Sequence, residues 1–103
     1  MKETNKFKFR SEHFYKLLNE QKYRCVLTNR ELTPENTNAE HILPISKGGK
    51  HEVENICLVV DMVGKLKRYF SEEEIVLLAS DIIKTKGKKY GFEIISKNKK
   101  TSR

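Results

Sequence analysis

Apolar residues recur at helical spacing in two segments, and each segment begins with a capping signal. From Ser11 onwards the spacing predicts a helix of about ten residues, and a serine at this position is suited to cap it. Residues 71–74 read Ser-Glu-Glu-Glu, the pattern of a capping box, with acidic side chains at the positive end of a helix dipole. This second helix is expected to end at Gly87 and to bury one stripe of side chains: Ile75, Leu78, Ala79 and Ile82.

Between the two helices the pattern changes to short apolar runs separated by turn residues. Residues 23–32 alternate as two short strands around a turn would. Residues 39–45 and 52–57 predict a second pair of strands, joined by a loop with two adjacent glycines that would supply positive φ angles. Residues 58–69 return to helical spacing and predict a further helix. Helices and short strands mixed in this way indicate an α+β fold.

The two ends of the chain are polar and basic. Residues 1–10 form a basic arm, and residues 88–103 form a basic tail with one plausible strand at 92–95, which could pair with residues 7–9. The predicted folded domain is therefore 11–87. A chain of 103 residues normally builds one small domain around a single core.

Charge and composition narrow the class of partner. Lysine and arginine number 21 against 14 acidic residues, so the formal net charge of +7 favours a polyanion, with nucleic acid as the leading candidate. No run approaches the roughly 20 apolar residues of a membrane span, and no signal-peptide core follows the first residues. The expectation is a cytoplasmic protein without membrane contact. In that compartment Cys25 and Cys57 are expected as free thiols.

One stretch in the middle of the chain has the residue types of a catalytic motif. In order, it contains Glu40, His41, Pro44, Gly48, Gly49 and Asn55, followed by a basic segment of helical spacing. This arrangement resembles the HNH endonucleases, whose active site is a β-hairpin followed by a helix, the ββα-metal unit. The resemblance covers roughly residues 23–83. It implies a small single α+β domain in which that unit is flanked by helices, a prokaryotic or phage origin, and metal-dependent hydrolysis of DNA phosphodiester bonds.

The chain has three histidines, and the resemblance assigns catalysis to one of them. His41 would be the general base that takes the proton from the attacking water, since an unperturbed imidazole pKa of about 6.5 leaves it mostly neutral at cytoplasmic pH. Asn55 would fasten the hairpin loop and orient His41 by hydrogen bonding. His13 is expected as a partly exposed surface residue, and His51 as a loop or packing residue.

The metal ligands implied by the resemblance are incomplete. The family uses one divalent ion, for which Mg²⁺ is the first expectation and Mn²⁺ or Ni²⁺ are substitutes, and Glu40 holds the place of its first ligand. The second ligand would lie nine positions beyond Asn55, which is Gly64, without a side chain. Glycine inside a helix also costs about 1 kcal/mol relative to alanine, so helix propensity does not explain it.

Three interpretations of Gly64 fit the sequence. Asp61 lies one helical turn earlier and could supply the missing oxygen ligand. Alternatively, Glu40, water and substrate phosphates hold the metal without a second protein ligand. In the third interpretation the nuclease is inactive, by natural decay or by replacement of the ligand, and the chain is a DNA-binding or protein-interaction module on the same fold.

Many relatives in the HNH group also carry a zinc knuckle built from two CxxC pairs. The corresponding positions here hold Cys25 with Thr28, and Val60 with Val63. Structural zinc needs four Cys or His ligands, and one cysteine cannot supply them. No structural zinc is therefore expected, and apolar packing would replace it.

Basic residues surround the motif and predict contacts with DNA phosphates: Lys47, Lys50, Lys65, Lys67 and Arg68. Phosphate contacts position a nucleic acid without reading its sequence, so little base specificity is expected from this element. Double-stranded DNA is the expected partner, and a homodimer or a larger protein partner could add specificity. An RNA-binding module is permitted by the charge but is supported by no motif.

Overall fold

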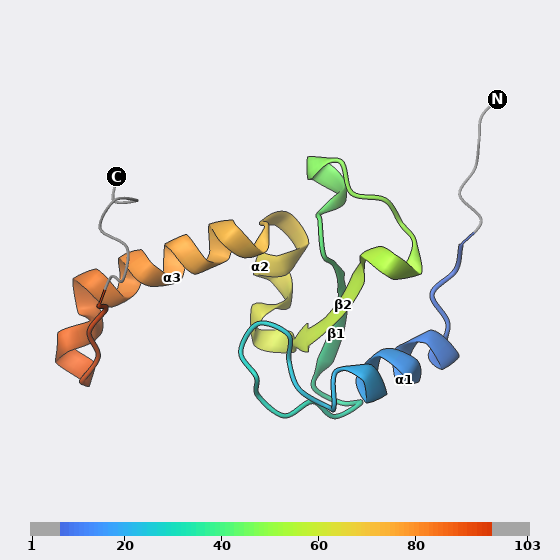
Figure 1. The fold of residues 1–103 in the computed structure, drawn as a ribbon, viewed down its shortest axis with the longest axis horizontal. Coiled ribbons are helices and arrows are strands. Elements are labelled where there is room, and N and C mark those ends of the chain that lie inside the picture. The colour runs from blue at the N-terminus through green and yellow to red at the C-terminus, as the bar shows by residue number, and fades with distance from the viewer. Residues whose placement is uncertain (1–6, 96–103) are drawn as a thin grey trace. The chain divides into compact units, whose positions relative to one another are not determined.

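The computed structural model describes residues 7–95 and has an α+β fold (Figure 1). Its helices and strands are α1 (Ser11–Glu20), β1 (Thr37–His41), β2 (Ile56–Val60), α2 (Gly64–Tyr69) and α3 (Glu72–Lys86), with short 3₁₀ turns between them. The chain divides into two compact units, the first ending at Glu72 and the second beginning at Glu73. This division falls inside the predicted domain of residues 11–87. All the predicted site residues belong to the first unit.

Helix α1 begins and ends close to the prediction, but its cap differs. Arg10 is the N-cap residue and Ser11 is already the first helical residue, so the prediction that Ser11 caps the helix is wrong. The backbone N–H of Arg10 instead donates to Nδ1 of His13 at 3.0 Å. His13 therefore satisfies one of the donors at the helix start, which is a structural role.

Strands β1 and β2 form a two-stranded antiparallel sheet with a register that runs from Thr37↔Val60 to His41↔Ile56. The predicted boundaries are shifted. β1 already ends at His41 rather than at residue 45, and the return strand continues to Val60, where a helix was predicted. All five residues of β2 are buried. A run of β-branched and apolar residues that is buried on both faces explains why strand formation overrides the helical spacing of residues 58–60.

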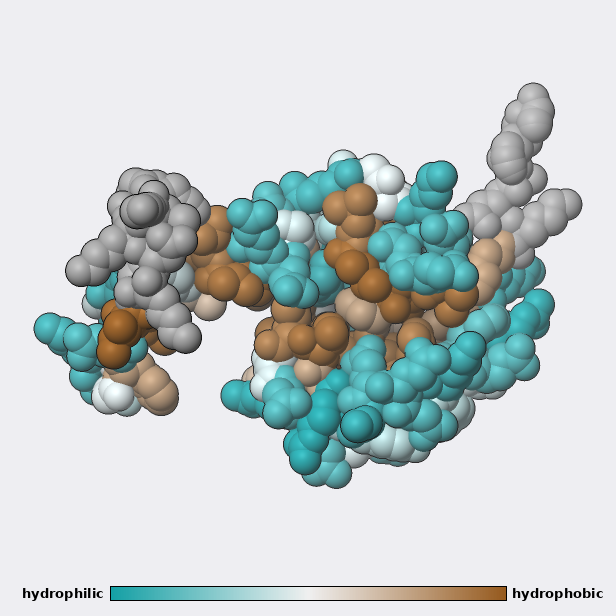
Figure 2. All heavy atoms as spheres, viewed as in Figure 1, coloured by the Kyte–Doolittle hydropathy of each residue, from teal (hydrophilic) through white to brown (hydrophobic). Residues whose placement is uncertain are grey.

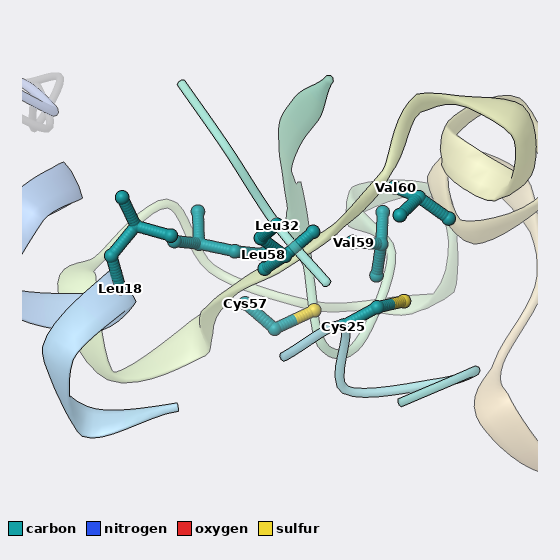
Figure 3. Close-up of a cluster of buried hydrophobic side chains, with 7 residues drawn as sticks. All are labelled: Leu18, Cys25, Leu32, Cys57, Leu58, Val59 and Val60. Carbon is teal, nitrogen blue, oxygen red and sulfur yellow. The ribbon is translucent and has the colours of Figure 1, made fainter. Parts of the chain in front are cut away.

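The core of the first unit is built around β2. Four of its residues pack with buried side chains from α1 and from the segment that follows it: Leu18, Cys25, Leu32, Cys57, Leu58, Val59 and Val60 (Figure 3). Gln21 joins α1 to the edge of β2 that β1 leaves open. Its amide donates to the Leu58 carbonyl at 3.0 Å and accepts from the Leu58 N–H at 3.0 Å. The strand is thus hydrogen-bonded on both edges at its centre.

The segment of residues 23–32 forms a turn with one antiparallel bridge, Arg24↔Glu31, where two short strands were predicted. Cys25 is buried in this turn, and its Sγ accepts the N–H groups of Leu27 and Thr28 at 3.4 and 3.3 Å. Both cysteines are free thiols, as expected. Burial raises the pKa of Cys57 to about 11, so this thiol is inert at neutral pH.

The second unit contains α3 and a 3₁₀ turn, Gly87–Tyr90. No residue of α3 is buried, and Leu78 and Ile82 are 45% and 54% exposed, so the predicted buried stripe is wrong. In the part of the second unit that the structure describes, one helix and one short turn offer no second layer that could cover such a face. Neither residues 92–95 nor residues 7–9 form a strand, and their predicted pairing is therefore wrong as well.

Two further expectations concern the ends of the chain and the membrane. The outer parts of the predicted arm and tail, residues 1–6 and 96–103, lie outside the described residues. Over residues 7–95, no helix combines the length and the apolar character that crossing a bilayer requires.

Candidate active site and nucleic-acid interface

His41 is the last residue of β1, and its ring is paired with a second histidine. Nε2 of His41 lies 3.0 Å from Nδ1 of His51, which is a hydrogen bond whose donor depends on the tautomer. The ring of Phe7 packs on the edge of His51, with centroids 5.1 Å apart. When Nε2 of His41 is the donor, its Nδ1 keeps a free lone pair. In that tautomer, Nδ1 of His41 is the nitrogen that could accept a proton from water.

The surroundings of His41 favour its neutral form. Burial lowers the pKa of His41 below its ordinary value, and the charge of neighbouring His51 lowers it further. The Glu40 carboxylate acts in the opposite direction, while the Lys67 ammonium again lowers the pKa. Because the lowering effects dominate, the surroundings shift the pKa of His41 downward and favour the neutral imidazole, which is the state that a general base requires.

Asn55 closes the loop between the two strands through its side-chain amide. Oδ1 accepts the N–H of Leu43 at 2.9 Å, and Nδ2 donates to the carbonyls of Leu43 and Lys50 at 3.0 and 2.8 Å. The backbone carbonyl of Asn55 also accepts the N–H of Ile42 at 2.7 Å. Asn55 thus fastens the loop in the expected way. It holds the residues directly after His41, so its effect on the histidine passes through the backbone.

The two adjacent glycines of this loop have different functions. Gly48 has a φ of +96°, the left-handed conformation that glycine adopts at little cost. Gly49 has no positive φ, contrary to the prediction. A Cβ there would overlap the Leu43 carbonyl and lie 2.9 Å from Nδ2 of Asn55, so this position needs glycine because the backbone of Leu43 approaches closely.

Glu40 precedes His41 and points to the other face of the strand. It is only 7% exposed, and its Oε2 lies 3.4 Å from Nη2 of Arg68, which comes from α2. The hydrogen bond from Arg68 and the negative charge of Glu40 raise the pKa of the guanidinium further. Arg68 was predicted as a DNA contact only. Its position four residues after Gly64, on the same helix face, is the sequence signal that could have identified it as a partner of Glu40.

Gly64 is the first residue of α2 and is buried, so it does not occupy a helix interior. A Cβ at this position would overlap the side-chain amide of Asn38 on β1. Asn38 and Glu40 lie two residues apart and therefore on the same face of the strand. The glycine allows α2 to pack closely against β1, and this packing supplies the reason for Gly64 that helix propensity could not.

Asp61 is not brought to Glu40. It is exposed after the end of β2, and its N–H donates to the carbonyl of Asn36 at 2.8 Å. Residue 36 lies four residues before Glu40, a separation of roughly 13 Å along an extended strand. The suggestion that Asp61 supplies the second ligand beside Glu40 is therefore not supported by this geometry.

The donor set at Glu40 does not fit a resident divalent ion. Over residues 7–95, no three His, Cys, Asp or Glu side chains come together in a group that could hold a metal. Divalent ions of this class prefer several oxygen ligands, whereas here a single carboxylate already faces a guanidinium. Among the described residues, Glu40 is thus the one candidate ligand for the metal that the resemblance implies. A cation, Arg68, already lies beside it.

The predicted phosphate-binding residues separate into two groups. Lys47, Lys50, Lys65 and Arg68 are exposed. Lys67 is only 2% exposed, and its Nζ donates to the carbonyls of Ile42 and Phe70 at 2.7 and 3.3 Å. The prediction that Lys67 touches DNA is therefore wrong, because an ammonium held inside by two carbonyls cannot reach a phosphate. Lys67 instead fixes α2 against the residue that follows His41.

Hydrophobic side chains also reach the surface beside the site. Ile42, Leu43 and Ile45 are exposed around the hairpin loop that carries Lys47 and Lys50. Figure 2 shows brown hydrophobic residues between teal hydrophilic ones on the visible face. This surface therefore offers apolar contact as well as positive charge, a combination suited to a sugar-phosphate backbone and base edges.

Comparison of the chain with models of protein families finds no match, and comparison with curated proteins finds none either. The resemblance to the HNH endonucleases therefore stays a prediction from the sequence.

Proposed function

We propose that this chain is a DNA endonuclease of the HNH type, in which His41 is the general base for phosphodiester hydrolysis. The observation that carries the proposal is the hydrogen-bonded pair of His41 with His51 at the end of β1. Beside it stands the loop that Asn55 closes. Together they hold a neutral imidazole at the position that the motif assigns to the base.

The chemistry requires one proton acceptor at the attacking water. Water would attack the phosphorus while His41 takes its proton at Nδ1, and the bond to the leaving oxygen would break as that oxygen gains a proton from solvent water. A neutral imidazole with a lowered pKa is a competent acceptor at pH 7. The hydrogen bond to His51 holds the ring of His41 in one orientation, as the partner of a catalytic base does.

His41 is a better candidate for this role than the other two histidines. Nδ1 of His13 is occupied by the N–H of Arg10 at the start of α1. His51 uses its Nδ1 in the pair with His41 and packs against Phe7. The role of base therefore goes to the histidine that stands directly beside Glu40 in the motif.

Double-stranded DNA is the proposed substrate. The net charge of +7 and the exposed cations of the hairpin and α2 favour a polyanion. The motif carries the choice of DNA over RNA. A homodimer or a larger partner protein would add the base specificity that phosphate contacts do not provide.

The surroundings of Glu40 favour a second candidate function. Glu40 is engaged by Arg68 and Gly64 offers no ligand, so the same fold could bind DNA without cleaving it. This binding module would keep the exposed cations and lose hydrolysis.

Nicking of supercoiled plasmid separates the two candidates. The chain, its His41→Ala variant and a His13→Gln control would be compared with Mg²⁺, with Mn²⁺ and with EDTA. We expect nicking by the chain and by the control, and a loss of at least about 100-fold in His41→Ala, since general-base catalysis contributes roughly 10²–10⁴-fold. Unchanged nicking in His41→Ala overturns the proposal. DNA binding without nicking by the chain itself selects the binding module.

A further inference from the structure

We propose that Arg68 takes the place of a divalent cation at this site and binds the phosphodiester directly, with Glu40 as the residue that positions its guanidinium. The inference rests on the proposed substrate, a nucleic-acid phosphodiester, and it does not depend on hydrolysis. It assigns phosphate binding to Arg68 and Glu40, the pair whose chemistry does not fit the metal site of the HNH family.

The first support is the burial of Glu40. A carboxylate that is 7% exposed needs compensation for the water that it loses. Within residues 7–95, Arg68 is its ion-pair partner, with a single N···O contact of 3.4 Å. The negative charge of Glu40 is therefore committed to a cation that the chain itself provides.

The second support is the exposure of Arg68. Its side chain is 52% exposed although one edge contacts Glu40. A guanidinium has five N–H donors in a planar fork, so contacts to Glu40 and to the Tyr69 side chain still leave other donors available on this half-exposed group. That fork matches two oxygens of a phosphate, which is why arginine is preferred where a phosphate is held in a fixed orientation.

The packing of α2 explains how Arg68 reaches this position. Gly64 lets the first turn of the helix lie against Asn38 of β1, and the side chain one turn later then lies over Glu40. Lys67, on the same helix, is anchored to the Ile42 carbonyl at 2.7 Å. The helix is thus fixed at both of its turns, and Arg68 is held by a rigid element.

The local charge favours an anion over a divalent cation. Glu40 contributes one negative charge, whereas Arg68 and the buried Lys67 contribute one positive charge each. Nζ of Lys67 donates to two carbonyl oxygens, so its charge is solvated by dipoles and is not neutralised by an acid. A divalent cation would therefore be repelled from this site, and a phosphate would be attracted. Both effects are stronger than in bulk water because the site is partly buried.

Direct metal binding gives the first test. Mn²⁺ would be titrated into the full chain and its Glu40→Gln variant, with electron paramagnetic resonance used to count the free ion. We expect no difference between the two proteins at up to millimolar Mn²⁺. One Mn²⁺ per chain that disappears in Glu40→Gln overturns the inference, and it would point to Glu40 together with another donor such as the neighbouring Asn38.

Binding of a short DNA duplex in EDTA gives the second test, by fluorescence anisotropy at fixed salt. We expect equal affinity in EDTA and in Mg²⁺, and a loss of about tenfold in Arg68→Ala, as for a charge-assisted hydrogen-bonded contact. Lys65→Ala is the matched control, because Lys65 is an exposed cation of the same helix. Its loss should be roughly twofold. Equal losses in the two variants, or binding that needs Mg²⁺, overturn the inference.

A third variant guards against a folding defect, since Arg68→Ala leaves the buried Glu40 without its partner. Arg68→Gln can still donate a hydrogen bond to Glu40 but carries no charge. We expect it to melt close to the unsubstituted chain and yet to lose DNA affinity as Arg68→Ala does. Retention of full affinity in Arg68→Gln overturns the inference.

The outcomes separate this inference from the proposed nuclease function. EDTA-resistant binding through Arg68 without plasmid nicking would sustain the inference and refute the nuclease. Nicking that depends on an ion bound at Glu40 would sustain the nuclease and refute the inference.

Discussion

The two sides of the β1–β2–α2 unit differ in how closely they follow the motif. On the hairpin side, His41 has a hydrogen-bonded partner and Asn55 closes the loop. On the helix side, Gly64 packs on Asn38, and Arg68 forms an ion pair with Glu40. The hairpin side thus holds the proposed base, whereas the helix side has close packing at Gly64 and a guanidinium at Glu40, where the resemblance would place metal ligands. Under the proposed function, the acid–base half of the motif would be kept while its metal half is replaced by packing and a fixed positive charge.

The largest effect on stability is expected on the hairpin side, from Asn55→Ala. The substitution removes three side-chain hydrogen bonds to Leu43 and Lys50, each worth about 0.5–1.5 kcal/mol net, so we expect a loss of about 2–4 kcal/mol. Denaturant unfolding measures it. Asn19→Ala, at an exposed asparagine of α1, is the control and should change stability by less than about 0.5 kcal/mol. A similarly small effect of Asn55→Ala would show that its amide does not hold the loop.

A somewhat smaller effect is expected on the helix side, from Gly64→Asn, which restores the side-chain type of a ligand. The new Cβ would overlap the Asn38 amide, and overpacking of this kind costs about 1–3 kcal/mol. Shortening the neighbour in a Gly64→Asn, Asn38→Ala double variant should recover much of that loss, measured as a coupling free energy. If Gly64→Asn is as stable as the unsubstituted chain, close packing is not the reason for the glycine.

The third prediction concerns the pKa of His41. The charge of His51 lowers this pKa, so His51→Gln should raise it toward the ordinary value of about 6.5. The base must be neutral, and the acid limb of the nicking rate against pH should then move to higher pH by the same amount. An NMR titration of His41 provides the pKa independently of activity. A pKa that falls or stays constant in His51→Gln would contradict the assigned pairing.

Local patterns predicted the elements of this fold better than their boundaries. The helix after Arg10, the paired strands and the helix that follows them could be inferred from spacing and turn residues, whereas the role of Asn55 was implied by the resemblance to the HNH endonucleases. The extension of β2 to Val60 could not, because burial on both faces decides it and local spacing does not show burial. The exposure of α3 was not predicted for a related reason, since an amphipathic pattern shows only that a face could be buried.

The candidate site divides in the same way. His41 and Asn55 could be predicted from the resemblance because both belong to one continuous stretch of sequence. The partners His51 and Arg68, and the burial of Lys67, depend on side-chain contacts between segments 10 to 28 residues apart. Charge alone assigned Lys67 to DNA, and packing assigns it to the protein interior. Contacts of this kind become visible only when the segments are folded together.

The most direct test of the base side is the tautomer of His41, read from its ring nitrogen shifts in ¹⁵N-labelled protein at pH 7. The assignment of Nδ1 of His41 as the proton acceptor predicts a neutral ring with its proton on Nε2, donated to His51, and a free lone pair on Nδ1. That signature should change in His51→Gln. A protonated ring at pH 7, or a neutral ring with its proton on Nδ1, would contradict the assignment of His41 as the base.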